Sequence, residues 1–343
     1  MKSYALYRLP HADHCTRIEQ TAGSPQPLHA CSELDGQSGF AIAPFQAGPE
    51  EPIWLIRPDR VEQMPLKRPM NRNAINGEPE DNPAQYAAEF RLFHQTLETG
   101  RFRKIVLARS ATLPNHHDVQ PEELFWRACA AYPRLFIALA AMPDGGYWLT
   151  ATPEILLEGR GAEWRTIALA GTMQLSGDEL NGEGEGIRWS AKNIQEQRYV
   201  ASYIASCLEH FSLKFEEEGP RTVRAAHLVH LRSDFTFTLP DPGKTGQLLQ
   251  LLHPTPAVCG LPKQETLDFI LQNEHPRRQY YSGFMGPIGM DGETHLYVSL
   301  RCMHIGPDEY RLYAGGGLLK DSRLEQEWQE TEAKMQTMRN LFS

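Results

Sequence analysis

Short apolar runs bounded by turn residues mark the chain from residue 100 onward. Such runs indicate β-strands, because apolar and β-branched residues pack well on a pleated, half-buried surface. The first four are KIVLARSATL, LFIALAAM, YWLTATPEILLEG and WRTIALAGTM. Three more stand in the last third of the chain: YYSGFMGPIGM, HLYVSLRCMHI and YRLYAGGGL. Residues 1–80 carry weaker signals, so we expect irregular structure there, with short strands such as 39–43 and 53–56.

Apolar residues at helical spacing predict helices over 84–99, 190–211, 243–252, 264–273 and 322–341. The predicted strands come in neighbouring pairs with helices interspersed, and strict alternation of strand and helix is absent. This order favours an α+β fold with large, mainly antiparallel sheets. A chain of 343 residues exceeds the usual domain size, yet a large mixed sheet can extend this far around one core. We therefore expect one domain over residues 1–343.

The helix at 190–211 carries a carboxylate in line with its apolar face. Glu196, Val200, Tyr203 and Cys207 follow the i, i+4, i+7, i+11 series of one helix face. A buried carboxylate needs a cation, a metal ion or a proton, because an unpaired charge is costly among apolar groups. The alternative is a glutamate at the rim of the face that points to water.

The last helix repeats this arrangement. Glu327, Glu330 and Lys334 are spaced i, i+3, i+7 and border an apolar sector. A solvated face of ion pairs is one explanation. The other is a metal site, because Mg²⁺ commonly binds one or two carboxylates and completes its shell with water and substrate oxygens. Two helices that each offer a carboxylate beside an apolar face favour the metal site.

Two polar residues and two glycine segments also depart from simple packing patterns. Lys104 opens the strand KIVLAR, and a lysine that enters a buried strand can serve as a general base. Glu154 precedes an apolar run, and a carboxyl group among apolar neighbours can keep its proton and act as an acid. At a strand end, either residue can instead face solvent. The segments LAGT at 169–172 and AGGG at 314–317 let a ligand approach the backbone closely.

Charge and cysteine usage restrict the class of protein. The 43 acidic and 34 basic residues give a net charge of −9, which argues against a nucleic-acid surface. None of the six cysteines forms a CxxC pair, so free thiols in a reducing compartment are expected. The N-terminal sequence lacks a signal peptide, and no run approaches the roughly 20 apolar residues of a membrane helix. We expect a cytoplasmic protein without nucleic-acid or membrane partners.

Nine segments, taken in order, resemble the chorismate-utilising family, which includes anthranilate, aminodeoxychorismate, isochorismate and salicylate synthases. They are KIVLAR, ATPEILLEG, LAGT, KNIQEQ, VHL, HPTPAVCGLPK, SLRC, RLYAGGG and EWQETEAK. The likeness covers about residues 100–343, whereas residues 1–99 match poorly. It implies the fold of anthranilate synthase component I, with two large facing sheets, helices outside them and the active site in a cleft between them.

Within that family the resemblance points to isochorismate synthase, a Mg²⁺-dependent isomerase that acts on chorismate. Lys104 stands where isochorismate and salicylate synthases carry a water-activating lysine and ammonia-using members typically carry glutamine. No glutaminase subunit is therefore expected. HPTPAVCGLPK is similar to the isochorismate synthase form, and the likeness is greatest to the menaquinone-pathway type. The alternatives are a siderophore-pathway isochorismate synthase, a salicylate synthase, an ammonia-using synthase and a non-catalytic chorismate-binding protein.

The resemblance also implies a role for each site residue. Lys104 would deprotonate water for attack at C2 of chorismate, and Glu154 would protonate the leaving C4 hydroxyl group. Glu196 and Glu330 would bind Mg²⁺, with Glu327 as an additional carboxylate beside them. The residues implied to bind substrate are Gly171, Thr172, His253, Arg301, Gly315, Gly316 and Lys334.

Overall fold

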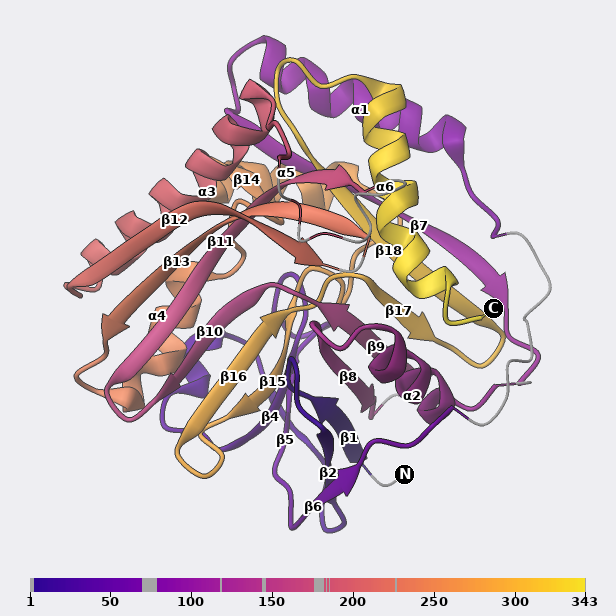
Figure 1. The fold of residues 1–343 in the computed structure, drawn as a ribbon, viewed down its shortest axis with the longest axis vertical. Helices are drawn as coiled ribbons and strands as arrows, with labels where there is room; N and C mark the ends of the chain where they lie inside the picture. Colours follow the sequence, from indigo (N-terminus) through magenta and orange to yellow (C-terminus); the bar gives the residue numbers. More distant parts are fainter. Residues whose placement is uncertain are drawn as a thin grey trace.

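The computed structural model describes residues 3–69, 79–117, 119–143, 146–175, 182, 184, 186–225 and 227–342. Within these ranges the chain forms two nine-stranded sheets with antiparallel pairing between neighbours (Figure 1). Helices pack on the outer faces of both sheets. This arrangement confirms the α+β fold expected from the order of strands and helices.

The first sheet is built from strands at both ends of the chain. Its order is β14 (Gly260–Leu261), β7 (Lys104–Pro114), β18 (Glu309–Leu318), β17 (Cys302–Ile305), β9 (Tyr147–Thr152), β8 (Phe136–Ala141), β1 (Ser3–Arg8), β2 (His14–Gln20) and β6 (Arg60–Pro65). Three helices pack on its outer face, α1 (Pro83–Glu98), α2 (Pro121–Ala131) and α6 (Leu324–Arg339). Figure 1 shows α6 crossing the strands at the C-terminal end of the chain.

The second sheet has the order β12 (Phe215–Ala225), β13 (Leu228–Thr238), β11 (Glu163–Gln174), β10 (Ile155–Arg160), β16 (Glu293–Val298), β15 (Phe284–Ile288), β4 (Gly39–Ala43), β5 (Ile53–Ile56) and β3 (Gln26–Leu28). Helices α3 (Ala191–His210) and α4 (Thr245–Leu252) cover its outer face, and α5 (Lys263–Asn273) packs beside β14. Ser190 caps α3 by accepting a hydrogen bond from the backbone N–H of Asn193, which fixes where that helix begins.

An apolar layer between the two sheets holds them together. It joins Ala138 and Phe136 of the first sheet to Phe40, Met285 and Tyr297 of the second. The rings of Phe136 and Tyr297 stack with their centroids 4.3 Å apart. Such a shared core fixes the position of one sheet relative to the other, so a site between them can be rigid.

Two of the places where the chain passes from one sheet to the other lie side by side. Between β9 and β10 the crossover contains Glu154, and between β16 and β17 it contains Arg301. The crossovers hydrogen-bond to one another: the N–H of Val298 donates to the carbonyl of Glu154, and the N–H of Ala151 donates to the carbonyl of Arg301. Arg301 has a φ of +46°, a left-handed conformation that non-glycine residues rarely adopt.

Several expectations from the sequence need correction. The N-terminal third was expected to be irregular apart from short strands such as 39–43 and 53–56. These two are confirmed as β4 and β5, but β1, β2, β3 and β6 also form, so this part contributes six strands to the two sheets. YWLTATPEILLEG and HLYVSLRCMHI were each predicted as one continuous run, and each is divided by a crossover. Helix α2 and strand β12 were not predicted; the residues of β12 are mostly exposed and polar, so they lack the apolar pattern of a strand. The five predicted helices are present with ends within two residues of those expected.

Two segments of interest fall partly outside the described residues. The connection expected over 57–83 contains β6, but residues 70–78 are not described. The acidic, glycine-rich segment at 174–188, expected to be a loop, is described at only some positions. In the described part of the chain, the helices are all too short or too polar to cross a membrane.

Candidate active site

A narrow cavity opens where the two crossovers meet helices α3 and α6. Its lining comes from both sheets, both helices and the loop before α5. The lining residues are Val106, Glu154, Leu169, Ala170, Gly171, Thr172, Glu196, His230, Ala257, Val258, Tyr281, Leu300, Arg301, Tyr313, Ala314, Gly315, Gly317 and Lys334. Seven residues predicted from the sequence are among them: Glu154, Gly171, Thr172, Glu196, Arg301, Gly315 and Lys334.

Chemistry rather than size distinguishes this cavity. Its free volume is about 60 Å³, whereas an open hollow beside Trp164 and Phe237 measures about 700 Å³. The larger hollow lies at one end of the second sheet, beside β10, β11, β12, β13 and β16, where Glu158 already pairs with Arg165 and accepts a hydrogen bond from Tyr297. The smaller cavity gathers buried charged groups from distant segments, which is the usual mark of an active site.

The glycine run of β18 gives side chains room to approach the strand. A Cβ atom at Gly317 would lie 2.1 Å from Oε1 of Glu196 and 2.9 Å from Cε of Lys104. At Gly316 it would lie 3.0 Å from Oε2 of Glu327 and 3.9 Å from Oε1 of Glu330. Carboxylates from α3 and α6 therefore approach consecutive residues of one strand, and a side chain at Gly317 would displace Glu196.

Each of these carboxylates is paired with a lysine. Nζ of Lys104 lies 2.9 Å from Oε1 of Glu196, and Nζ of Lys334 lies 2.7 Å from Oε1 of Glu330. The third pair is Lys192 with Glu327, which joins α3 to α6. The side chains of Glu196 and Glu330 are only 12% and 24% exposed, so neither is a fully solvated surface carboxylate.

The pKa of one of these carboxyl groups is lowered by its environment, and the pKa of another is raised. Burial opposes the charge on Glu196, but Lys104 and Lys192 outweigh it and lower the pKa of this carboxyl group. Burial and repulsion from Glu330 raise the pKa of Glu327, against the attraction of Lys192. Glu196 is therefore an anion at neutral pH and can serve as a ligand for a cation.

The donor set fits a magnesium ion held in part by substrate and water. Within the described ranges, no three His, Cys, Asp or Glu side chains form a complete ligand set. Glu196 and Glu330 supply hard oxygen donors from two helices. Mg²⁺ is usually held by one or two carboxylates and keeps several waters, so two such side chains are sufficient.

Glu154 is a buried acid at the first crossover. Its side chain is almost inaccessible, and burial raises the pKa of its carboxyl group to about 7, against the opposing attraction of Lys104, Arg301 and Lys334. A substantial fraction of Glu154 therefore carries a proton at neutral pH. Such a group can donate a proton to a bound ligand.

Arg301, at the second crossover, offers a cation to the cavity. Its Nη2 donates to Nε2 of His230 at 2.8 Å, so Nε2 is the acceptor and the ring proton is on Nδ1, which faces the carbonyl of Gly171 at 3.0 Å. Burial, reinforced by Arg301, lowers the pKa of His230 well below its usual value and keeps the ring neutral. Nη1 of Arg301 is buried and has no hydrogen-bond partner among the described residues. It is therefore available to bind an anionic ligand.

The remaining predicted residues lie around this cavity or apart from it. Lys104, Glu330 and Gly316 contact the groups described above without lining the cavity. His253 is not among the lining residues. Its Nε2 lies 3.2 Å from the carbonyl oxygens of Pro44 and Phe45, where it joins the end of α4 to the segment after β4.

Sequence reasoning missed several residues of the site. His230 was not among the predicted site residues, yet it lines the cavity and hydrogen-bonds to Arg301. Tyr281 and Tyr313 also line it, with their rings stacked 5.4 Å apart, and Lys192 joins the two carboxylate-bearing helices. His230, Lys192 and Tyr313 stand inside the motifs VHL, KNIQEQ and RLYAGGG, but each resembles an ordinary strand or surface residue. Tyr281 lies outside the motifs and has no such signal.

Comparisons with known proteins identify a family. A family model described as chorismate binding enzyme matches residues 54–343. The salicylate biosynthesis isochorismate synthase of Pseudomonas aeruginosa is 36% identical over 72% of this chain, which spans about half (52%) of that protein. Isochorismate synthase DhbC of Bacillus subtilis is 31% identical, with 96% of this chain and 87% of that protein covered.

A solved structure agrees with the fold. The menaquinone-specific isochorismate synthase MenF of Escherichia coli matches with a TM-score of 0.84 and 21% identity, covering 100% of this chain and 89% of that one. At this identity the likeness supports the arrangement of sheets and helices. The chemistry must be argued from the side chains.

Proposed function

The chain belongs to the chorismate-binding enzyme family, and we propose that it is an isochorismate synthase, an isomerase that converts chorismate to isochorismate. The reaction adds a hydroxyl group at C2 of the ring and removes the one at C4. We also propose that residues 1–343 act as one catalytic domain, since both ends of the chain contribute strands to the first sheet.

The observation that carries this proposal is a buried amine and a partly protonated acid beside one cavity. Lys104 reaches the site from the start of β7, and Glu154 lines it from the first crossover. Lys104 accepts a proton from a water molecule that attacks C2, and Glu154 donates its proton to the departing C4 hydroxyl group, which leaves as water. An allylic displacement at neutral pH needs a base and an acid held in this way.

Cationic and backbone groups hold the two carboxylates of the substrate. Arg301 offers its free Nη1, and Lys334 lines the cavity beside the backbone of Gly315 and Gly316. Gly171 and Thr172 form the wall against which the ring lies. Glu196 and Glu330 would hold Mg²⁺, which would supply positive charge to neutralise a substrate carboxylate.

Three related activities are the alternatives. A salicylate synthase would follow the same first step with loss of pyruvate, and an ammonia-using synthase would form an aminated product with the help of a glutaminase. A chorismate-binding protein without catalysis would turn over nothing. Lys104 and the complete set of charged groups favour the isomerase, which needs no glutaminase partner.

The product and its cofactor can be tested together. Purified protein is incubated with chorismate, with Mg²⁺ or with EDTA, and the products are separated by chromatography. We expect isochorismate only when Mg²⁺ is present, and restoration of activity when excess Mg²⁺ is added after EDTA. Salicylate fluorescence with pyruvate release would identify a salicylate synthase, and an aminated product in ammonium salts would identify an ammonia-using enzyme. Absence of turnover would contradict the proposal.

We assign the product to menaquinone synthesis in the cytoplasm, with siderophore synthesis as the alternative. The overall resemblance of the sequence to the menaquinone-pathway type supports this assignment. Deleting the gene from its host and measuring menaquinone and secreted siderophore separates the two pathways. Loss of menaquinone is the expected result, and loss of siderophore alone would reverse the assignment.

A further inference from the structure

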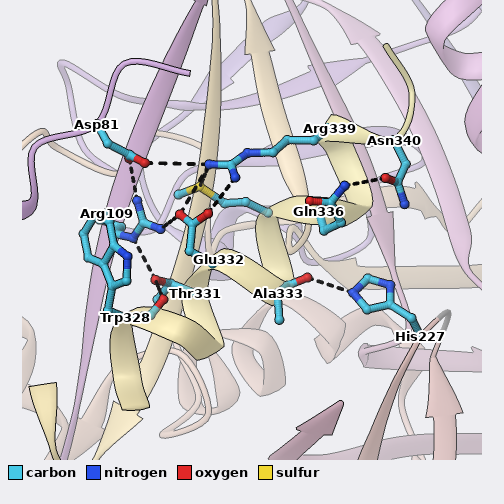
Figure 2. Close-up of polar contacts among 11 residues, drawn as sticks. Asp81, Arg109, His227, Trp328, Thr331, Glu332, Ala333, Gln336, Arg339 and Asn340 are labelled. Carbon is cyan, nitrogen blue, oxygen red and sulfur yellow. Dashed lines mark hydrogen bonds and ion pairs between the residues drawn. The ribbon is translucent and has the colours of Figure 1, made fainter. Parts of the chain in front are cut away.

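Arg109, a buried arginine, joins helix α6 to the first sheet. Arg109 lies on β7 five residues after Lys104, so the two side chains leave opposite faces of the strand. Nε of Arg109 donates to Oγ1 of Thr331 at 2.7 Å, Nη1 lies 2.5 Å from Oδ1 of Asp81, and Nη2 donates to Glu332 (Figure 2). The guanidinium also lies 3.7 Å from the ring centroid of Trp328.

These contacts surround the carboxylate assigned to the metal. Thr331 follows Glu330 directly, and Trp328 and Glu332 lie two residues to either side of it. Successive helix residues are rotated by about 100°, so the segment that contacts Arg109 also fixes the direction of Glu330. A rotation or a slide of α6 that moved Glu330 from Gly316 would break the bond to Thr331 and the stack on Trp328.

Further contacts brace the same segment of α6. Arg339 pairs with Glu332 at 2.6 Å and lies 3.7 Å from Asp81, which closes the network around Arg109 (Figure 2). On the other side, Nε2 of His227 donates to the carbonyl of Ala333 at 2.9 Å. His227 precedes β13, the strand that carries His230. The helix is thus fixed between the strand of Lys104 and the strand of His230.

We propose that Arg109 is a positioning residue that sets the orientation of Glu330 and Lys334 toward the metal and the substrate. This inference rests on the proposed function, because it presumes that Glu330 is a metal ligand. A planar guanidinium is required: its three nitrogens bind three different partners while its face stacks on Trp328. A lysine keeps the positive charge, but its ammonium group lacks the several planar N–H donors of a guanidinium and the flat surface that stacks on an aromatic ring.

The test compares Arg109→Lys with a matched control, Arg8→Lys. Arg8 is also buried, but it lies on β1, elsewhere in the same sheet, and binds the backbone carbonyls of Tyr132, Pro133 and Leu135. Binding of Mn²⁺, as a probe for the metal site, is measured by electron paramagnetic resonance without substrate, and thermal unfolding is measured in parallel. Partners behind a metal ligand typically change affinity about 10-fold to 100-fold.

We expect both substitutions to lower Tm and only Arg109→Lys to weaken Mn²⁺ binding, by about tenfold or more. Equal Mn²⁺ affinity in the wild type and Arg109→Lys would overturn the positioning role. If Arg109→Lys does not fold, Thr331→Val removes the partner next to Glu330 and keeps the arginine; unchanged affinity there overturns the role equally. Failure of the wild type to bind Mn²⁺ would instead contradict the metal site on which the proposed function depends.

Discussion

The amine of Lys104 lies 2.9 Å from the carboxylate of Glu196, so the proposed base and a proposed metal ligand are in direct contact. One comes from the first residue of β7 and the other from the second turn of α3. The bare backbone of Gly317 leaves space for both side chains. A metal ion bound to Glu196 would therefore compete with this ion pair.

Lys104→Ala should abolish most of the activity. Without the amine no group remains to deprotonate water, and loss of a general base typically lowers kcat by about 10²–10⁴-fold. Turnover is measured as isochorismate formation, and chorismate binding is measured by tryptophan fluorescence. The control Lys214→Ala, at an exposed position, should behave as the wild type. A Lys104→Ala enzyme that binds chorismate normally and reacts at the wild-type rate would refute the assignment of the base.

Glu154 should impose a limit on activity at high pH. Its carboxyl group has a pKa of about 7 and must carry a proton to act as an acid, so kcat/KM should fall as the pH rises through 7. Glu154→Gln, which cannot donate this proton, should be at least 100-fold slower. A wild-type profile that is flat from pH 6 to pH 9 would argue against the role.

The same residue should make stability depend on pH. The pKa of Glu154 is raised from 4.5 to about 7, so the native state binds more protons than the unfolded state between these values. The free energy of unfolding should therefore decrease as the pH rises through that window. Glu154→Gln removes this decrease and should be more stable than the wild type at pH 8, but not at pH 4. Urea unfolding at both pH values measures the difference, and a variant that is destabilised equally at both would contradict the buried acid.

Glu330→Gln should raise the requirement for Mg²⁺. The amide loses the charge that binds the ion and leaves Lys334 without its anionic partner. A charged contact contributes about 1.5–3 kcal/mol, so the Mg²⁺ concentration for half-maximal activity should increase roughly 10-fold to 100-fold. Glu325→Gln, an exposed change on the same helix, is the control. An unaltered Mg²⁺ dependence in Glu330→Gln would exclude this residue as a ligand.

Gly317→Ala should inactivate the enzyme while the fold persists. The new methyl group would stand 2.1 Å from Glu196 and 2.9 Å from Lys104, so both side chains must move. Circular dichroism should remain that of the wild type, and kcat should fall with the loss of the positioned base. Gly48→Ala, where no atom lies within 4 Å of the added Cβ, is the control. Normal activity of Gly317→Ala would show that neither side chain needs its present position.

The parts of the fold that the sequence predicted are those with local periodicity. The five helices were found because their apolar residues recur at helical spacing, as in α3. The crossovers were missed because Glu154 and Arg301 stand within runs that stay apolar on both sides. A run of strand residues does not reveal in which sheet it pairs, since that depends on partners far away in the chain.

The site could be predicted only as far as its motifs extend. Seven of the expected residues line the cavity. The histidine expected to line it was His253, whereas the one that does so is His230. Both histidines are buried, and both follow apolar residues, so no local pattern separates them. Arg109 could not be identified from the sequence either, since its proposed role depends on the packing of α6 against β7.

The paired crossovers have a consequence for how the protein can be divided. Glu154 and Arg301 acquire their places only where the chain leaves one sheet and enters the other, and each crossover is hydrogen-bonded to its counterpart. Neither sheet is a continuous segment of the chain, so no fragment can contain one sheet alone together with its part of the active site. Activity should therefore appear late during refolding, in a single step. Two separately produced fragments should restore activity only if they associate before they fold.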